Sequence, residues 1–222
     1  SSFVFSSSCA VYGEVSQDEL PVKEDTPFHP PPSPYHHTKQ ICEQMLEWFS
    51  RNKNIKVISL RYFNPAGSHP SGLLGDLPKA KPQNIFPALM RVILGIDREF
   101  IINGNDYPTN DGTCIRDYIH IKDLSRAHVL AIERLKTTKA NYEVFNLGTG
   151  TGYSVLEIIR ETEKTLGIKI PYRTGPRREG DATALYASNL KATTILGWKM
   201  EYTLSDIIRS SFEFYSRKLP IK

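Results

Sequence analysis

Tyr35 and Lys39 stand out in this 222-residue chain for the chemistry that their spacing permits. They lie four positions apart in a segment with a helical pattern, so their side chains share one helix face. A phenol with an ordinary pKa near ~10 is a weak base at neutral pH, and a nearby cation favours its ionised form. Ser33 is the expected N-cap and Pro34 the first helical residue, which places Tyr35 near the positive end of the helix dipole. The pair predicts proton transfer coupled to a redox step.

A Tyr-x-x-x-Lys pair alone is common on solvated helix surfaces, so support from a second element is needed. The chain opens with an apolar run that predicts a buried strand ending in three hydroxyl residues, Ser6, Ser7 and Ser8. Ligands of open parallel sheets bind beyond the carboxyl ends of the strands. We therefore expect the serines in that crevice beside the tyrosine and lysine, where one of them completes a hydroxyl relay to a substrate alcohol.

The elements that position these groups follow from hydrophobic spacing. The helix that carries the pair is predicted over residues 34–51, and Ile41, Met45, Leu46 and Phe49 are expected to face a core or a partner helix. Trp198 is expected in the core. Further predicted elements are strands at 56–60 and 143–147 and helices at 86–94, 121–135 and 204–217.

Six motifs, taken in order, resemble the extended short-chain dehydrogenase/reductases, and within that family the UDP-galactose (UDP-glucose) 4-epimerases. The resemblance covers essentially the whole chain. The motifs are SSSCAVYG at residues 6–13, PYHHTK at 34–39, LRYFNPAG at 60–67, GNDYPT at 104–109, RDYIH at 116–120 and RREGD at 177–181.

The resemblance implies an α/β fold: the C-terminal part of a doubly wound, Rossmann-like parallel sheet, with a smaller mixed α/β substrate domain. Residues 1–65 then belong to the NAD-binding Rossmann domain. Residues 66–222 form mainly the UDP-sugar-binding domain, with about 115–148 returning to the Rossmann sheet.

A dinucleotide-binding domain should open with a strand, a glycine-rich turn and a helix, and this chain lacks such an opening. Its glycine-rich stretch at 146–153 has neither the third glycine at the required step nor an acidic residue about 20 positions on. A strand-to-helix turn explains it better, with Ser154 and Glu157 as a capping box. We therefore expect a truncated form that starts within the cofactor domain.

The activity implied by the resemblance is NAD-dependent interconversion of UDP-galactose and UDP-glucose. Tyr35 removes the proton from the sugar 4-hydroxyl while hydride leaves C4, Ser8 hydrogen-bonds the same oxygen, and Lys39 tunes Tyr35 and holds the nicotinamide ribose. The 4-keto sugar then turns over and takes hydride back on its opposite face. The residues implied for NAD are Ser7, Tyr35, Lys39, Tyr62 and Phe63.

The resemblance also implies a nucleotide grip that includes arginines, whose planar fork binds phosphate oxygens bidentately. Asn103 departs from the family, which usually has an aromatic residue there to stack on uracil. Leu185 occupies a position where residue size influences whether N-acetylated sugars fit. The implied substrate residues are Ser8, Asn64, Asn84, Ile85, Asn103, Arg116, Arg178, Asp181 and Leu185.

Several alternatives remain open. A UDP-pentose (arabinose or xylose) 4-epimerase uses the same chemistry, and a non-catalytic nucleotide-sugar-binding remnant would explain the missing cofactor half. Dehydratases and decarboxylases are disfavoured because Cys9 and Ala10 follow Ser8 where those enzymes place carboxyl groups. A serine hydrolase is disfavoured because this chain has no nucleophile-elbow glycine pattern around Ser8. By composition alone, Arg116 beside Asp117 is a surface ion pair and residues 177–179 a solvated charge run.

Composition limits partners and compartment. No run of residues is apolar enough to span a membrane. The net charge is +4, but acidic and basic residues are interspersed, which argues against binding of nucleic acid. The histidines show no metal-ligand spacing, so no metal site is expected. Three scattered cysteines favour a reducing compartment, and we expect a cytoplasmic protein. The resemblance implies a homodimer through the tyrosine-bearing helix.

Overall fold

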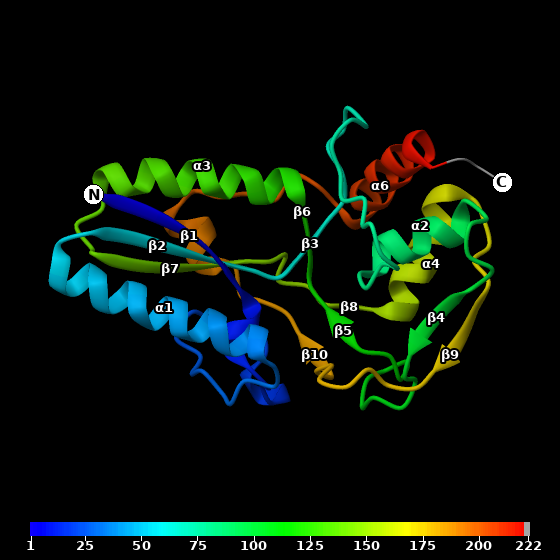
Figure 1. Cartoon of the computed structure of the whole chain (residues 1–222), viewed down its shortest axis with the longest axis horizontal. Helices are drawn as coiled ribbons and strands as arrows, with labels where there is room; N and C mark the ends of the chain where they lie inside the picture. The colour runs from blue at the N-terminus through cyan, green and yellow to red at the C-terminus, as the bar shows by residue number, and fades with distance from the viewer. Residues whose placement is uncertain (220–222) are drawn as a thin grey trace.

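A three-stranded parallel sheet in the order β1-β2-β7 forms one half of the molecule (Figure 1). Its strands are β1 (Ser2–Ser8), β2 (Lys56–Tyr62) and β7 (Tyr142–Leu147). Helix α1 (Pro34–Lys53) covers one face and helix α3 (Ile121–Thr137) the other. The computed structural model describes residues 1–219.

The central position of β2 fits its sequence, because Val57, Ile58 and Leu60 supply apolar side chains to both faces of a strand that is covered on both sides. Residues 57–61 of β2 are all buried, and Ile58 and Leu60 pack with Phe145 and Leu147 of β7. Trp198 completes this cluster with no exposed surface, and its indole N–H donates to the carbonyl of Asp123 at 2.9 Å. The prediction of a core tryptophan is confirmed.

The expectation of a buried first strand is wrong for most of β1. Phe3 is 47% exposed, and Ser7 is the only buried residue of the strand. Within the described part of the chain β1 pairs with β2 alone, so it is an edge strand and one of its sides has no sheet neighbour.

The other half combines short strands with a layer of helices (Figure 1). Strand β3 (Asn64–Ala66) pairs with β6 (Tyr118–His120), β4 (Phe100–Asn103) pairs with β9 (Tyr172–Gly175), and β5 (Ile115–Arg116) lies between β8 (Tyr153–Ser154) and β10 (Ala184–Leu185). The remaining helices are α2 (Ile85–Ile93), α4 (Val155–Leu166), α5 (Leu190–Ile195) and α6 (Leu204–Lys218), with 3-10 turns η1 (Cys9–Tyr12) and η2 (Gln17–Glu19).

The predicted elements are present with ends shifted by one or two residues. The fold is mixed α/β with parallel strand pairs, as expected, and Ser154 and Glu157 form the predicted capping box after the glycine-rich turn. The domain limits near residues 65, 115 and 148 stay predictions. Among the residues described, no helix is both long and apolar enough to cross a bilayer.

One expectation for α1 is wrong and a second is narrowed to one of its alternatives. Ser33 occupies the N-cap position, but its hydroxyl bonds to His36 Nδ1 at 2.7 Å and caps no backbone amide. Of the two alternatives for the apolar residues of α1, the structure excludes a core, since Ile41, Met45 and Phe49 are 39%, 54% and 40% exposed, and a partner helix stays a prediction. The buried face of α1 instead carries polar residues, because it covers a sheet whose central strand contributes an arginine.

Candidate active site

The first turns of α1 lie beside the end of β1, as the hydroxyl and lysine pattern predicted. Lys39 Nζ donates to the carbonyl oxygen of Ser6 at 2.9 Å and stands 5.7 Å from the ring centroid of Tyr35. Tyr35 is 55% exposed, so its side chain is accessible to a ligand. Ser8 Oγ accepts from the Ala10 amide at 3.2 Å and so caps η1. A phenol, an ammonium and a hydroxyl therefore come from the same edge of the sheet.

Tyr62 ends β2 next to this edge. Its hydroxyl lies 2.6 Å from His128 Nε2, and His128 Nδ1 is 2.9 Å from the carbonyl of Leu124. Since a carbonyl only accepts, Nδ1 carries the imidazole proton, and the Tyr62 hydroxyl donates to Nε2. Burial raises the pKa of the Tyr62 phenol, which keeps it a neutral donor.

Two residues expected to contact the cofactor turn their side chains inward. Ser7 is 2% exposed and its hydroxyl donates to Glu43 on the inner face of α1. Phe63 is 4% exposed and packs with Val11 and Leu185. The reason is the alternation of side chains along a strand: Ser6 and Ser8 share one face of β1, and Ser7 takes the other.

A cleft of about 1190 Å³ opens in the other half of the molecule, between β3, the start of α2, β4 and the loop after β9. It is lined by both polar and apolar groups. Ser8 and Leu185 are not among its lining residues. The predicted substrate residues that line it are Asn64, Asn84, Ile85, Asn103, Arg116, Arg178 and Asp181.

Arg116 and Arg178 bring positive charge to the wall of the cleft. Arg116 Nη2 pairs with Asp181 Oδ1 at 3.2 Å, and both side chains are largely buried. Arg178 Nη2 donates to the backbone and side-chain oxygens of Gln83 at 3.1 and 2.9 Å. Each guanidinium keeps unused N–H donors, which suits binding of an anion.

The interpretation of Arg116 and Asp117 as a surface ion pair is wrong. Asp117 has no exposed surface, and its carboxylate accepts from the amides of Thr149, Gly150 and Ala187 at 2.7, 3.3 and 3.1 Å. Burial raises the pKa of this carboxyl group. Asp117 thus ties the glycine-rich turn to the strand that carries Leu185. Sequence analysis missed this role, because its three partners lie 32 to 70 positions away.

Residues 177–179 are exposed, as a solvated run would be, but both arginines have specific partners. Arg177 Nε bonds to Asp106 Oδ1 at 2.7 Å, and its guanidinium lies 4.1 Å from the ring centroid of Tyr107. This arrangement anchors the loop that supplies Arg178 to the GNDYPT segment.

The neighbouring polar groups limit the chemistry of the site. Burial raises the pKa of the Cys9 thiol to about 12, so Cys9 is no thiolate nucleophile at neutral pH. Leu185 and Cys9 belong to one apolar cluster, and Leu185 is paired in register with Arg116. Within residues 1–219, no group of three or more His, Cys, Asp or Glu side chains is placed to hold a metal ion.

Residues 1–211 match the sequence model of the family described as GDP-mannose 4,6 dehydratase. The chain belongs to this family. Among its relatives is the UDP-glucose 4-epimerase of Bifidobacterium longum subsp. longum, 45% identical over 215 residues that make up 96% of this chain and 62% of the relative. The chain thus spans less than two thirds of the relative's length.

Solved structures of UDP-glucose 4-epimerases share the fold of this chain. The UDP-glucose-4-epimerase from Stenotrophomonas maltophila, with bound NAD and formylated UDP-arabinopyranose, superimposes with a TM-score of 0.93 at 41% identity, covering 98% of this chain and 64% of that one. The Bifidobacterium longum enzyme in complex with NAD+ and UDP gives 0.91 at 44% identity, covering 97% and 64%. The fold is therefore Rossmann-like, and these structural neighbours carry NAD.

Proposed function

We propose that this chain carries the proton-transfer residues and the nucleotide-sugar cleft of an NAD-dependent UDP-glucose 4-epimerase. The observation that carries the proposal is that Lys39 bonds to the Ser6 carbonyl, two residues before Ser8, and stands near the Tyr35 ring, in a chain that also holds an arginine-lined cleft. The named relatives support it, since they are UDP-glucose 4-epimerases.

The residues present fit the nicotinamide side of NAD. The Lys39 ammonium has three N–H donors and uses one on Ser6, so two remain for ribose hydroxyls. Tyr35 is exposed enough to meet a ligand, and Tyr62 closes the edge of the site through its bond to His128. When bound, NAD supplies a reversible acceptor for the hydride from the sugar C4.

The side chains then carry the proton. In the oxidation direction, Tyr35 as phenolate takes the proton of the sugar 4-hydroxyl, and the Ser8 hydroxyl hydrogen-bonds the same oxygen. Lys39 Nζ, 5.7 Å from the centroid of the Tyr35 ring, places a positive charge beside this side chain. In the reverse direction Tyr35 returns the proton to the 4-keto oxygen, after the sugar has turned its other face to the hydride donor.

The cleft supplies the grip that such a turn requires. Arg116 and Arg178 present N–H donors to a diphosphate, and Asn84 and Asn103 present amide groups toward a uridine. If the nucleotide provides most of the binding energy, the sugar stays free to rotate between the two half-reactions.

The test joins this chain to the N-terminal segment of the Bifidobacterium longum epimerase that supplies the dinucleotide turn, and follows conversion of UDP-galactose to UDP-glucose with NAD. We expect turnover in the joined protein. Tyr35→Phe should lower kcat by about 10²-fold or more, the usual scale for loss of a general base. Tyr172→Phe, at an exposed tyrosine of β9, is the matched control and should leave kcat unchanged. A folded joined protein that binds NAD yet leaves UDP-galactose unchanged would refute the hexose assignment.

A UDP-pentose 4-epimerase is the second candidate, because the Stenotrophomonas maltophila structure holds a formylated UDP-arabinopyranose. The same assay with UDP-arabinose and UDP-xylose distinguishes the two. Binding of UDP-sugars with no turnover of either kind would favour a nucleotide-sugar-binding remnant.

We further propose a homodimer formed through α1. Its outer face exposes apolar side chains that the sheet does not cover: Ile41, Met45, Trp48 and Phe49. Sedimentation of the joined protein tests this, with Trp48→Lys expected to yield monomers. The free cysteines Cys9, Cys42 and Cys114 support a reducing, cytoplasmic location.

A further inference from the structure

A buried ion pair joins α1 to the sheet directly behind the candidate active site. Glu43 and Arg61 are 2% and 4% exposed. Arg61 Nη2 donates to Glu43 Oε2 at 2.7 Å, and Arg61 Nε lies 3.1 Å from both carboxylate oxygens. Neither residue lines the cleft.

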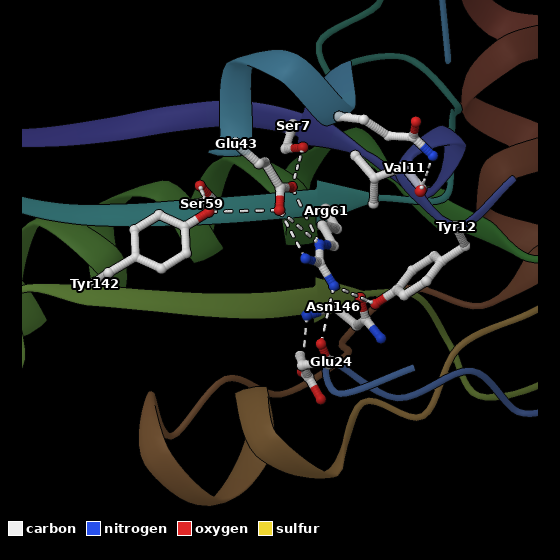
Figure 2. Close-up of polar contacts among 10 residues, drawn as sticks. Ser7, Val11, Tyr12, Glu24, Glu43, Ser59, Arg61, Tyr142 and Asn146 are labelled. Atoms are coloured by element: carbon white, nitrogen blue, oxygen red, sulfur yellow. Dashed lines mark hydrogen bonds and ion pairs between the residues drawn. The ribbon is translucent and has the colours of Figure 1, made fainter. Parts of the chain in front are cut away.

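Figure 2 shows that the Glu43 side chain of α1 contacts polar side chains from all three strands. Its carboxylate accepts from Ser7 of β1 and from Arg61 of β2, and the hydroxyl of Tyr142, in β7, lies 3.4 Å from Oε2. A shift of the helix along its axis, or a rotation about it, breaks contacts to several strands at once.

The arginine extends the network toward the end of β1. Arg61 Nη1 donates to the Tyr12 hydroxyl at 2.9 Å and to the Glu24 carbonyl at 3.1 Å, and the Tyr12 hydroxyl donates to Asn146 Oδ1 at 2.6 Å (Figure 2). Tyr12 belongs to η1, whose N-cap is Ser8. The network thus touches the segments on both sides of the catalytic hydroxyl.

Glu43 lies one helical turn beyond Lys39 and about two turns beyond Tyr35, on the same face of α1. We propose that the Glu43–Arg61 ion pair is a positioning device that sets the rotation and axial position of α1, and thereby where Tyr35 and Lys39 stand relative to Ser8. The two are positioning residues, and their effect on turnover rests on the proposed epimerase function.

A buried ion pair differs from apolar residues at the same positions in the orientation that it imposes, more than in the stability that it adds. A buried ion pair contributes little over well-packed apolar residues of similar volume, whereas removal of one partner leaves an uncompensated charge. Directional hydrogen bonds from Arg61 and Ser7 to one carboxylate define an orientation that apolar contacts do not. A double apolar replacement therefore separates positioning from stability.

The experiment compares Glu43→Gln, the double variant Glu43→Leu with Arg61→Met, and Arg61→Lys in the joined protein. Glu47→Gln, one turn further along α1 at a surface pair with Arg51, is the matched control. For each variant, Tm, kcat and KM for UDP-galactose are measured.

We expect the double variant to keep Tm within about 3 °C of the parent, while kcat falls about ten-fold or more because reacting groups are misplaced. KM should change by less than about two-fold, since the cleft lies on other elements. Arg61→Lys keeps the charge but loses the fork, and should lower kcat with the fold intact. A double variant with parental Tm and parental kcat overturns the proposal.

An activity-independent readout separates this proposal from the proposed function. Absence of turnover in the parent refutes the function, and amide hydrogen exchange then decides the positioning role. In the double variant at unchanged Tm, amides of residues 36–42 should exchange about ten-fold faster, while those of α3 keep their rates. If the double variant and the parent exchange the amides of residues 36–42 at the same rate, or if α3 is accelerated as much as these residues, the proposal is overturned whatever the activity.

Discussion

His120 predicts an acid-sensitive stability. It is 1% exposed, it caps α3 by accepting from the Lys122 amide at Nδ1 (3.1 Å), and its ring stacks on Tyr202 with centroids 4.2 Å apart. Nε2 lies 3.2 Å from Ser210 Oγ, whose own proton goes to the Asp206 carbonyl. A proton added at Nδ1 would face the amide N–H that this nitrogen now accepts from.

Burial lowers the pKa of His120 from 6.5 to about 4. Above pH 6.5 the imidazole is neutral in the folded and the unfolded state, so its full contribution is present. As the pH falls below 6.5, His120 binds a proton in the unfolded chain but not in the folded chain, so stability is lost until the pH reaches about 4. With ~1.36 kcal/mol per pKa unit, the loss is about 2 kcal/mol at pH 5 and about 3 kcal/mol at pH 4.

The measurement is urea unfolding at pH 7, 6 and 5 for the parent and for His120→Asn, which keeps a capping side chain without a titrating group. The parent should lose about 2 kcal/mol more than the variant between pH 7 and pH 5. His37→Asn, at an exposed histidine of α1, should follow the parent. Most carboxylate effects fall lower: backbone hydrogen bonds lower the pKa of Glu19 from 4.5 to about 2. Parallel profiles for parent and His120→Asn would refute the reasoning.

Three further substitutions test the site. Asp117→Ala leaves three backbone amides without their acceptor and should cost roughly 3–5 kcal/mol in urea unfolding; a cost below about 1 kcal/mol would contradict its anchoring role. The buried Tyr107 hydroxyl has no hydrogen-bond partner among residues 1–219, so Tyr107→Phe should leave the unfolding free energy unchanged or raise it by about 1 kcal/mol, and a clear fall in Tm would reveal a missed partner. Leu185→Ala opens space beside Phe63, and should cost about 2–3 kcal/mol in stability while raising the turnover of N-acetylated UDP-sugars relative to UDP-glucose. An unchanged ratio of the two rates would show that the size of residue 185 does not set the sugar preference.

Local signals predicted most of the secondary structure. These signals depend on neighbours within a few residues: Pro34 at the first helical position, the apolar residues Val57, Ile58 and Leu60 of β2, and the capping box of Ser154 and Glu157. The Ser33 side-chain cap was not confirmed, because the Ser33 hydroxyl bonds to the His36 side chain instead of a backbone amide. The first half of β1 was predicted to be buried but is exposed, because an apolar sequence pattern does not distinguish an edge strand from a central one.

The candidate site also has residues that local patterns predicted and residues that depend on tertiary contacts. Helical spacing was enough to place Tyr35 and Lys39 on one face, and the order of strand and hydroxyls placed them near Ser8. The cleft residues came from the resemblance, and seven of them line one cleft in the structure. The roles of Asp117 and of Glu43 with Arg61 had no local signal, because a buried charge looks like a surface charge until its partners are known.

By itself the sequence determined the helix that carries the phenol and the ammonium, the strand that ends in hydroxyls, and the motifs of the family. These depend on backbone geometry within one or two turns of chain. Only the tertiary structure decided which polar side chains are buried and paired. Glu43 finds Arg61 across 18 positions, and Asp117 finds Ala187 across 70. Such pairs form when separate elements pack together, and burial without water makes each unmade bond costly enough to select one arrangement.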